Sequence, residues 1–154
     1  MKEKTEGIKV IAQNKKASFN YYLSDFLECG IALVGSEIKS IRNGGCNISD
    51  AYIIIKNGEA YILNMNISPY DKAANFTHDP LRTRKLLLHK KEINKLNNKI
   101  ILDGYTIVPV KIYLKKGRCK VLIATGKGKK LYDKRATIKE RDVNRNLNKA
   151  MKRN

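Results

Sequence analysis

Residues 51–67, AYIIIKNGEAYILNMNI, carry the clearest signal for the fold of this chain. Two runs rich in β-branched and aromatic residues flank Asn57-Gly58, a pair that supplies the positive φ angles of a type I′ turn. The stretch therefore predicts a β-hairpin. On its second arm, alternate side chains are predicted to share one face: Tyr61, Leu63, Met65 and Ile67.

Four further strands are predicted, at residues 7–13, 19–34, 105–114 and 119–125. Gly30 interrupts the second of these, which predicts a bend or bulge there, and Pro109 predicts a bulge or an edge position in the third. The sequence KKGR at 115–118 turns the chain between the last two strands. One face of the third strand is predicted to be apolar: Thr106, Val108, Val110, Ile112 and Leu114.

Two helices are predicted, at residues 35–45 and 81–97. Ser36 is a suitable N-cap for the first, and Gly44 is placed to close it. Asp79-Pro80 puts a cap residue before a proline at the start of the second, after a loop at 68–80. The second helix is predicted to have an apolar side with Leu86, His89, Ile93 and Leu96. Its remainder is basic, with Arg82, Arg84, Lys85, Lys90, Lys91 and Lys95.

These elements predict a mainly β fold with two or three short helices: an antiparallel, oligonucleotide-binding-type (OB-like) β-barrel. The barrel domain is expected over residues 1–125 and a flexible basic tail over 126–154. The tail holds 11 Lys and Arg against 3 Asp and Glu, and its sparse apolar residues cannot form a core. It is predicted to be an arm that becomes helical against a partner.

The charge of the chain points to a polyanionic partner. Its 154 residues hold 32 Lys and Arg against 14 Asp and Glu, a net charge of +18 that disfavours a compact monomer through self-repulsion. Nucleic acid is the first candidate and an anionic membrane surface the second. We expect a cytoplasmic protein, because the sequence shows neither a spanning apolar run nor a signal peptide.

The sequence gives little support for a catalytic site or a metal site. Cys29, Cys46 and Cys119 form no C-x-x-C pair, which predicts reduced thiols and no metal site. The sequence GKGKK at 126–130 lacks the spacing of a phosphate-binding loop, and His78-Asp79 has no nucleophile nearby. The sequence therefore predicts a binding protein with no catalytic residues and no cofactor.

Several residues are open to either a binding or a structural role. Glu28 is a carboxylate in a chain that is short of acids, so it is either a reader of RNA base edges or a partner in an intramolecular salt bridge. Arg82, Arg84 and Lys85 are either RNA contacts or a solvated face. Most tyrosines are predicted to pack inside the fold, whereas Tyr132 lies in the arm and is predicted to touch RNA.

Six segments together resemble the SmpB family of SsrA-binding proteins, in the right order from about Val10 to Asp142. They are IAQNKKA, GSEIKSIRNGGCNISDAY, NGEAYILNMNISPY, HDPLRTRKLLLHKKEI, GYTIVPVKIYLKKGRCKV and GKGKKLYDKRATIKERD. The resemblance implies an OB-type barrel that binds the tRNA-like domain of transfer-messenger RNA (tmRNA). It also implies an adaptor that brings alanyl-tmRNA, with EF-Tu, to stalled 70S ribosomes for trans-translation.

The resemblance also implies roles for individual residues. A tmRNA-facing surface corresponds to Asn14, Lys15, Lys16, Glu28, Leu87 and Lys120. A tail that occupies the decoding centre, against 16S rRNA, corresponds to Gly126, Lys127, Gly128, Lys129, Lys130, Tyr132, Asp133, Lys134 and Arg135. Gly126 and Gly128 are expected to form its hinge. The alternative is an OB-type ribosomal or translation-factor module with no preference for tmRNA.

Overall fold

A computed structural model describes residues 8–69, 79–130, 134–136 and 138–139. The described strands are β1 (Ile8–Gln13), β2 (Tyr21–Ile31), β3 (Cys46–Asn47), β4 (Tyr52–Lys56), β5 (Glu59–Leu63), β6 (Asn66–Ile67), β7 (Arg84–Leu87), β8 (Thr106–Lys115) and β9 (Arg118–Gly128). The helices of this part are α2 (Lys15–Asn20), α3 (Gly35–Arg42) and α4 (Lys90–Asp103). Residues 134–136 and 138–139 are also helical.

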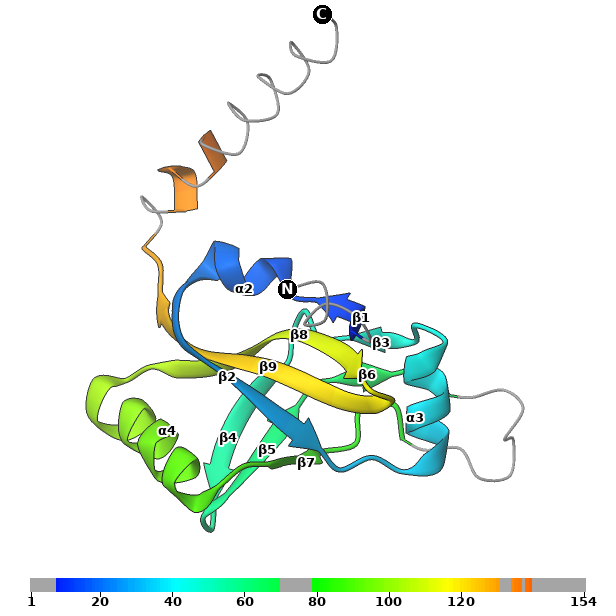
Figure 1. Cartoon of the computed structure of the whole chain (residues 1–154). Helices are drawn as coiled ribbons and strands as arrows, with labels where there is room; N and C mark the ends of the chain where they lie inside the picture. The colour runs from blue at the N-terminus through cyan, green and yellow to red at the C-terminus, as the bar shows by residue number, and fades with distance from the viewer. Residues whose placement is uncertain (1–7, 70–78, 131–133, 137, 140–154) are drawn as a thin grey trace, which may run out of the picture.

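The described strands form a seven-stranded antiparallel sheet in the order β1-β8-β4-β5-β7-β2-β9, and β3 pairs with β6 in a second, two-stranded sheet. Because β8 also pairs with β9, the pairings lead from β8 through β4, β5, β7, β2 and β9 back to β8. In Figure 1, α3 and α4 lie at opposite ends of the sheet, and α2 lies over the side with β1. The predicted mainly β fold with helices is confirmed.

The hairpin prediction is confirmed, but the predicted face of its second arm is only half right. Asn57 and Gly58 have φ of 53° and 76°, as a type I′ turn requires. Ala60 and Ile62, rather than Tyr61 and Leu63, are fully buried. Asn64, at φ 59°, then shifts the alternation, so that Met65 and Ile67 share a face, and both are buried.

Two bulges determine which side chains of the long strands face the core. The bulge of β2 lies between Ser24 and Leu27, so the bulge predicted at Gly30 is wrong. The bulge predicted at Pro109 is confirmed, because the β8–β9 register shifts between Pro109 and Lys111. It also breaks the predicted single apolar face of this strand: Ile107 is in the core before the bulge and Ile112 after it.

The helix predicted at 81–97 is wrong in its first half. Residues 84–87 form β7 with alternating buried and exposed side chains, and α4 begins only at Lys90. Asp79 caps a turn instead, since its Oδ1 accepts the Leu81 N–H at 3.0 Å. The N-cap of α3 is Val34 and not Ser36, because Glu37 reaches back to accept the Val34 N–H at 2.9 Å.

Candidate nucleic-acid interface

Glu28 lies on the outer side of the sheet, opposite Leu122 of β9. The Tyr113 hydroxyl of β8 donates a hydrogen bond to its Oε2, and Lys115 Nζ lies 3.6 Å from the same oxygen. The Glu28 side chain remains 38% exposed. The salt bridge considered from the sequence therefore exists, and the carboxylate still reaches solvent.

The pKa of Glu28 lies below its ordinary value. The Tyr113 hydrogen bond is the largest cause, partial burial opposes it, and the charges of Lys115 and Lys120 add to the lowering. The carboxylate is consequently ionised at neutral pH and acts only as a hydrogen-bond acceptor.

A row of directly opposed residues crosses four neighbouring strands beside Glu28. Leu87 of β7 pairs with Gly30 of β2, Gly30 with Lys120 of β9, and Lys120 with Tyr113 of β8. Directly opposed residues in antiparallel strands share a face of the sheet. Three of the predicted RNA contacts, Glu28, Leu87 and Lys120, are thus brought to one surface.

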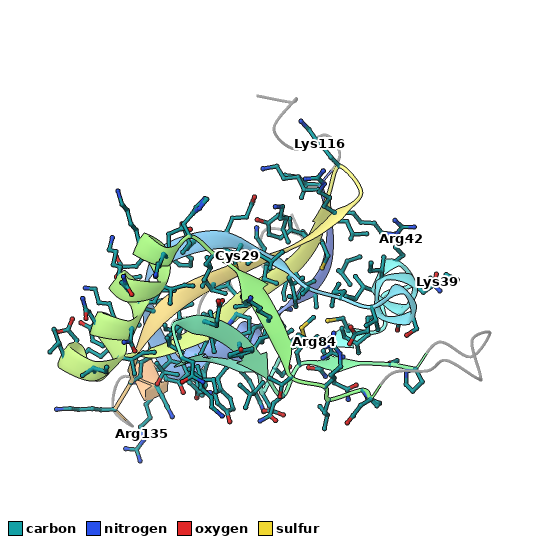
Figure 2. The ribbon with its side chains drawn as sticks, turned by 90° about the horizontal axis from the view of Figure 1, so that it is seen from below. Cys29, Lys39, Arg42, Arg84, Lys116 and Arg135 are labelled. Atoms are coloured by element: carbon teal, nitrogen blue, oxygen red, sulfur yellow. The ribbon has the colours of Figure 1, made fainter. Side chains whose placement is uncertain are left out.

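A groove of about 460 Å³ adjoins this row. Its lining combines aliphatic and cationic side chains: Ile31, Ala32, Leu33, Ile38, Arg42, Leu87, Arg118 and Lys120, with Gly30, Gly117 and Cys119. In Figure 2, Arg42 projects from α3 and Lys116 from the β8–β9 turn. Cations for phosphates, an exposed leucine for a base or sugar face and one acceptor for a base donor suit single-stranded RNA.

Asn14 differs from the other predicted contacts, because it is only 6% exposed. Its Oδ1 accepts the Ala17 N–H at 3.1 Å and its Nδ2 donates to the Pro109 carbonyl at 2.9 Å. Asn14 therefore caps α2 and ties it to β8, and its RNA contact stays a prediction. Lys15 and Lys16 are exposed on this helix, with Lys16 Nζ 3.3 Å from Asp50.

The predicted tail begins inside the sheet. Gly126 and Gly128 belong to β9, so the hinge predicted at these two glycines is wrong. A Cβ at Gly126 would lie 3.0 Å from the Tyr21 side chain, and this close approach explains the glycine. The strand thus passes the predicted boundary at residue 125, although the division into body and tail stays a prediction.

Past the strand, Lys129 is held to the body. Its N–H donates to the Asn20 carbonyl at 2.8 Å, and its Nζ lies 5.0 Å from the centroid of the Tyr22 ring. The Lys134 N–H donates to the Lys130 carbonyl at 3.1 Å. Tyr132 and Asp133 lie outside the described residues. Cationic tail residues are described at Lys127, Lys129, Lys130, Lys134 and Arg135.

One candidate RNA contact is buried instead. Arg84 has no exposed side-chain surface, and its Nε donates to Oε2 of the equally buried Glu37. Arg84 Nη1 also donates to the Met65 carbonyl at 2.7 Å, while Arg82 Nη2 donates to Glu37 Oε1 at 2.7 Å. In Figure 2, Arg84 lies within the body, whereas Lys116 projects from it. Arg84 is therefore a structural residue.

Tyr113 is the residue that sequence reasoning missed. The sequence predicts a packing role for Tyr113, and the residue is indeed 5% exposed, but its hydroxyl also donates to Glu28, which lies 85 residues away in the chain. Nothing in the local sequence indicates this contact, because it depends on β8 and β2 both pairing with β9.

The described residues do not form a metal site, a reactive thiol site or a membrane-spanning helix. No group of three or more His, Cys, Asp or Glu side chains there is arranged to hold a metal ion. Burial raises the pKa of Cys29 and of Cys46 to about 12, so both are protonated thiols at neutral pH. No helix of this part is long and apolar enough to span a membrane.

Comparisons with known proteins agree with one another. Residues 11–153 match the family model described as SmpB protein. The SsrA-binding protein of Enterococcus faecalis (strain ATCC 700802 / V583) is 53% identical over 151 residues, 98% of this chain and 97% of that protein. An SsrA-binding protein of Staphylococcus epidermidis is 50% identical over the same shares.

The fold has a close relative among solved structures as well. A chain from a structure described as "tmRNA-SmpB: a journey to the center of the bacterial ribosome" is 39% identical, with a TM-score of 0.66. The match covers 81% of the present chain and 86% of that one.

Proposed function

The chain belongs to the SmpB family, and we propose on this basis that it binds the tRNA-like domain of tmRNA and delivers it to stalled ribosomes. The proposed process is trans-translation, in which the ribosome is rescued and the nascent chain is tagged. The protein acts as an adaptor with no catalytic step of its own.

The observation that carries this proposal is the shared outer face of Glu28, Lys120 and Leu87. Leu87 is 54% exposed, and a large aliphatic side chain in that position suits stacking against an unpaired base or a ribose. Lys120 supplies a phosphate contact, and Glu28 accepts from a base donor. Lys15 and Lys16 extend the contact along α2, beyond the Asn14 cap.

An OB-like barrel is the proposed form of the body. The cycle of pairings from β8 back to β8 supports it, since a sheet that returns to its first strand has no open edge along that cycle. Such barrels commonly bind single-stranded nucleic acid on an exposed sheet face.

The tail is proposed to enter the decoding centre of a ribosome whose mRNA channel is empty. Lysines at 127, 129 and 130 would meet 16S rRNA phosphates, and Tyr132 would stack on a base. Asp133, Lys134 and Arg135 continue this contact. The proposed partners are tmRNA in its alanyl form, EF-Tu and the 70S ribosome, and the proposed compartment is therefore the cytoplasm.

A competition gel shift tests the RNA-binding part. Labelled tmRNA tRNA-like domain is challenged with excess elongator tRNA at near-physiological salt, because low salt lets charge alone imitate specificity. Binding that resists the competitor is the expected result. Equal competition would favour a general RNA-binding module of the translation machinery.

A truncation tests the division of labour between body and tail. Because β9 ends at Gly128, the chain should be cut after Lys130 rather than after Thr125. The shortened protein is expected to bind the tRNA-like domain nearly as well as the full chain and to lose tagging on stalled ribosomes. Loss of RNA binding would contradict the division.

A further inference from the structure

The contact between Tyr113 and Glu28 joins two strands that lie on either side of β9. Tyr113 is packed in β8 at 5% exposure, whereas the Glu28 side chain on β2 is 38% exposed. A buried phenol thus donates a hydrogen bond to a carboxylate that faces solvent. Packing in the core requires only the aromatic ring of Tyr113. Its hydroxyl instead contacts Glu28, which is the arrangement expected if Tyr113 orients a residue that contacts a ligand.

We propose that Tyr113 is a positioning residue for RNA recognition: it occupies Oε2 of Glu28, so that Oε1 accepts an N–H group from a base of the bound RNA. This inference rests on the proposed function, because it requires that Glu28 faces RNA.

The two oxygens of Glu28 have different surroundings. The Tyr113 hydroxyl and Lys115 Nζ both approach Oε2, and Oε1 has no such contact among the described residues. At 3.6 Å, Lys115 is too far for a good hydrogen bond and contributes mainly its charge. Tyr113 is therefore the group that sets the orientation of the carboxylate.

Orienting Glu28 before RNA arrives reduces the cost of binding. A glutamate on an exposed strand face loses rotamer freedom when it makes a contact, and that loss subtracts from affinity. The hydrogen bond with Tyr113 already restricts the Glu28 carboxylate in the folded protein, so most of this rotamer freedom is lost on folding and not on RNA binding. The remaining oxygen then accepts at a defined point on the outer face of the sheet.

The chemistry of the acceptor narrows what it recognises. A carboxylate cannot bind a phosphate, which offers only acceptors, so its partner in RNA is a donor: a base amino or imino group or a ribose 2′-hydroxyl. Lys115 on β8 and Lys120 on β9 are the cations that face Glu28, and they are placed to neutralise phosphates around it. In the proposed arrangement the base donor at Oε1 is thus flanked by phosphates that the two lysines neutralise.

Protonation states agree with these roles. Burial, and then the bond to Glu28, raises the pKa of Tyr113 above its ordinary value, so the phenol keeps the proton that it donates. Glu28 in turn stays ionised, with Tyr113 as the largest cause of its lowered pKa.

The test compares Tyr113→Phe with a matched control, Tyr105→Phe. The first change removes only the hydroxyl at Glu28; the second removes a hydroxyl from a ring that lies near Lys99 instead. Affinity for the tmRNA tRNA-like domain is measured at near-physiological salt, and the Glu28 carboxyl is titrated in the RNA-free protein by carbon-13 NMR. Tyr113→Phe is expected to weaken binding about tenfold and to raise the Glu28 pKa. Tyr105→Phe is expected to change neither.

A double variant separates positioning from simple structural damage. If Tyr113 acts through Glu28, then Glu28→Gln with Tyr113→Phe binds RNA no more weakly than Glu28→Gln alone. Additive losses would overturn the proposal. The proposal would also be overturned if Tyr113→Phe bound RNA with wild-type affinity while Glu28→Gln bound it more weakly. The proposed function would stand in that case. Wild-type affinity of Glu28→Gln itself would remove the RNA-facing role of Glu28 and the inference together.

Discussion

Glu37 and Glu28 both contact cationic side chains, but Glu37 is buried whereas Glu28 is partly exposed to solvent. Glu37 has no exposed side-chain surface and accepts from Arg82, Arg84 and the Val34 N–H. Glu28 keeps 38% of its side chain exposed and meets Tyr113 and Lys115 through one oxygen. Both residues are acids in a chain with few of them, and only the structure separates them.

The difference teaches how to tell a structural carboxylate from a binding one. Both oxygens of Glu37 are used, and its partners tie α3 to β7 and, through Arg84, to the Met65 carbonyl. Because both oxygens already accept hydrogen bonds, Glu37 is not available to a ligand, and the cluster instead stabilises the packing of α3 against β7. Among the residues that the structure describes, Glu28 is contacted at Oε2 alone, which leaves Oε1 to accept a hydrogen bond from a partner.

The largest expected effect is on Glu37. Glu37→Ala leaves Arg84 buried without its counter-charge, which is expected to cost about 3–5 kcal/mol of the free energy of unfolding. Urea denaturation measures this, with Glu28→Ala as the matched control. The control is expected to lose less than about 1 kcal/mol, because its site is solvent-exposed. Similar losses of stability in both variants would contradict the distinction between Glu37 as a structural carboxylate and Glu28 as a binding one.

Arg84→Lys should have the next largest effect. Lysine keeps the charge but cannot reach Glu37 and the Met65 carbonyl at once, so we expect a loss of about 2–3 kcal/mol in the same denaturation experiment. Arg82→Lys is the control, because Arg82 is 38% exposed and its substitution should cost about 1 kcal/mol or less. Equal costs would mean that burial of Arg84 is not what matters.

The pH dependence of stability should follow Glu37 as well. Burial opposes its ionisation, but hydrogen bonds from Arg82, the Val34 N–H and Arg84 outweigh it, and the pKa of Glu37 lies below its ordinary value of 4.5. The folded state thus gains stability above pH 4.5 that is lost as pH falls through the lower, folded-state pKa. Urea denaturation from pH 7 to pH 3 should show this fall in the wild type and in Glu28→Gln. A flat profile would contradict the assignment.

The smallest expected effect belongs to Lys115. Lys115→Met removes a charge 3.6 Å from Glu28 but leaves the Tyr113 hydrogen bond, so affinity for the tRNA-like domain should fall only about two- to threefold. Added salt should reduce the difference between variant and wild type, since the contact is screened. Filter binding at two salt concentrations measures it, and a tenfold loss would assign to Lys115 the role proposed for Tyr113.

The parts of the fold predicted correctly are those decided by local chemistry. The Asn57-Gly58 hairpin and the bulge at Pro109 follow from the backbone preferences of two or three residues. The sequence predicts helix where β7 lies, because the first of the two buried positions of this strand is an arginine: Arg84 interrupts the apolar alternation that identifies a strand. Its partner Glu37 lies 47 residues away and gives no local signal.

The candidate site shows the same limit. Leu87 and Lys120 are predicted as RNA contacts only through the resemblance to the SmpB family, whereas Glu28 is also a candidate from its own chemistry, and spacing alone cannot group the three. Their common face follows from pairings among β7, β2 and β9. Tyr113 escaped prediction because it joins them through a fourth strand.

The most direct test measures Glu28→Gln twice, once for affinity to the tmRNA tRNA-like domain and once for the free energy of unfolding. The substitution keeps the shape of the side chain and removes its charge. We predict about tenfold weaker binding with stability unchanged within about 0.5 kcal/mol. Unchanged affinity with a clear loss of stability would contradict the account, because Glu28 would then be a structural carboxylate like Glu37.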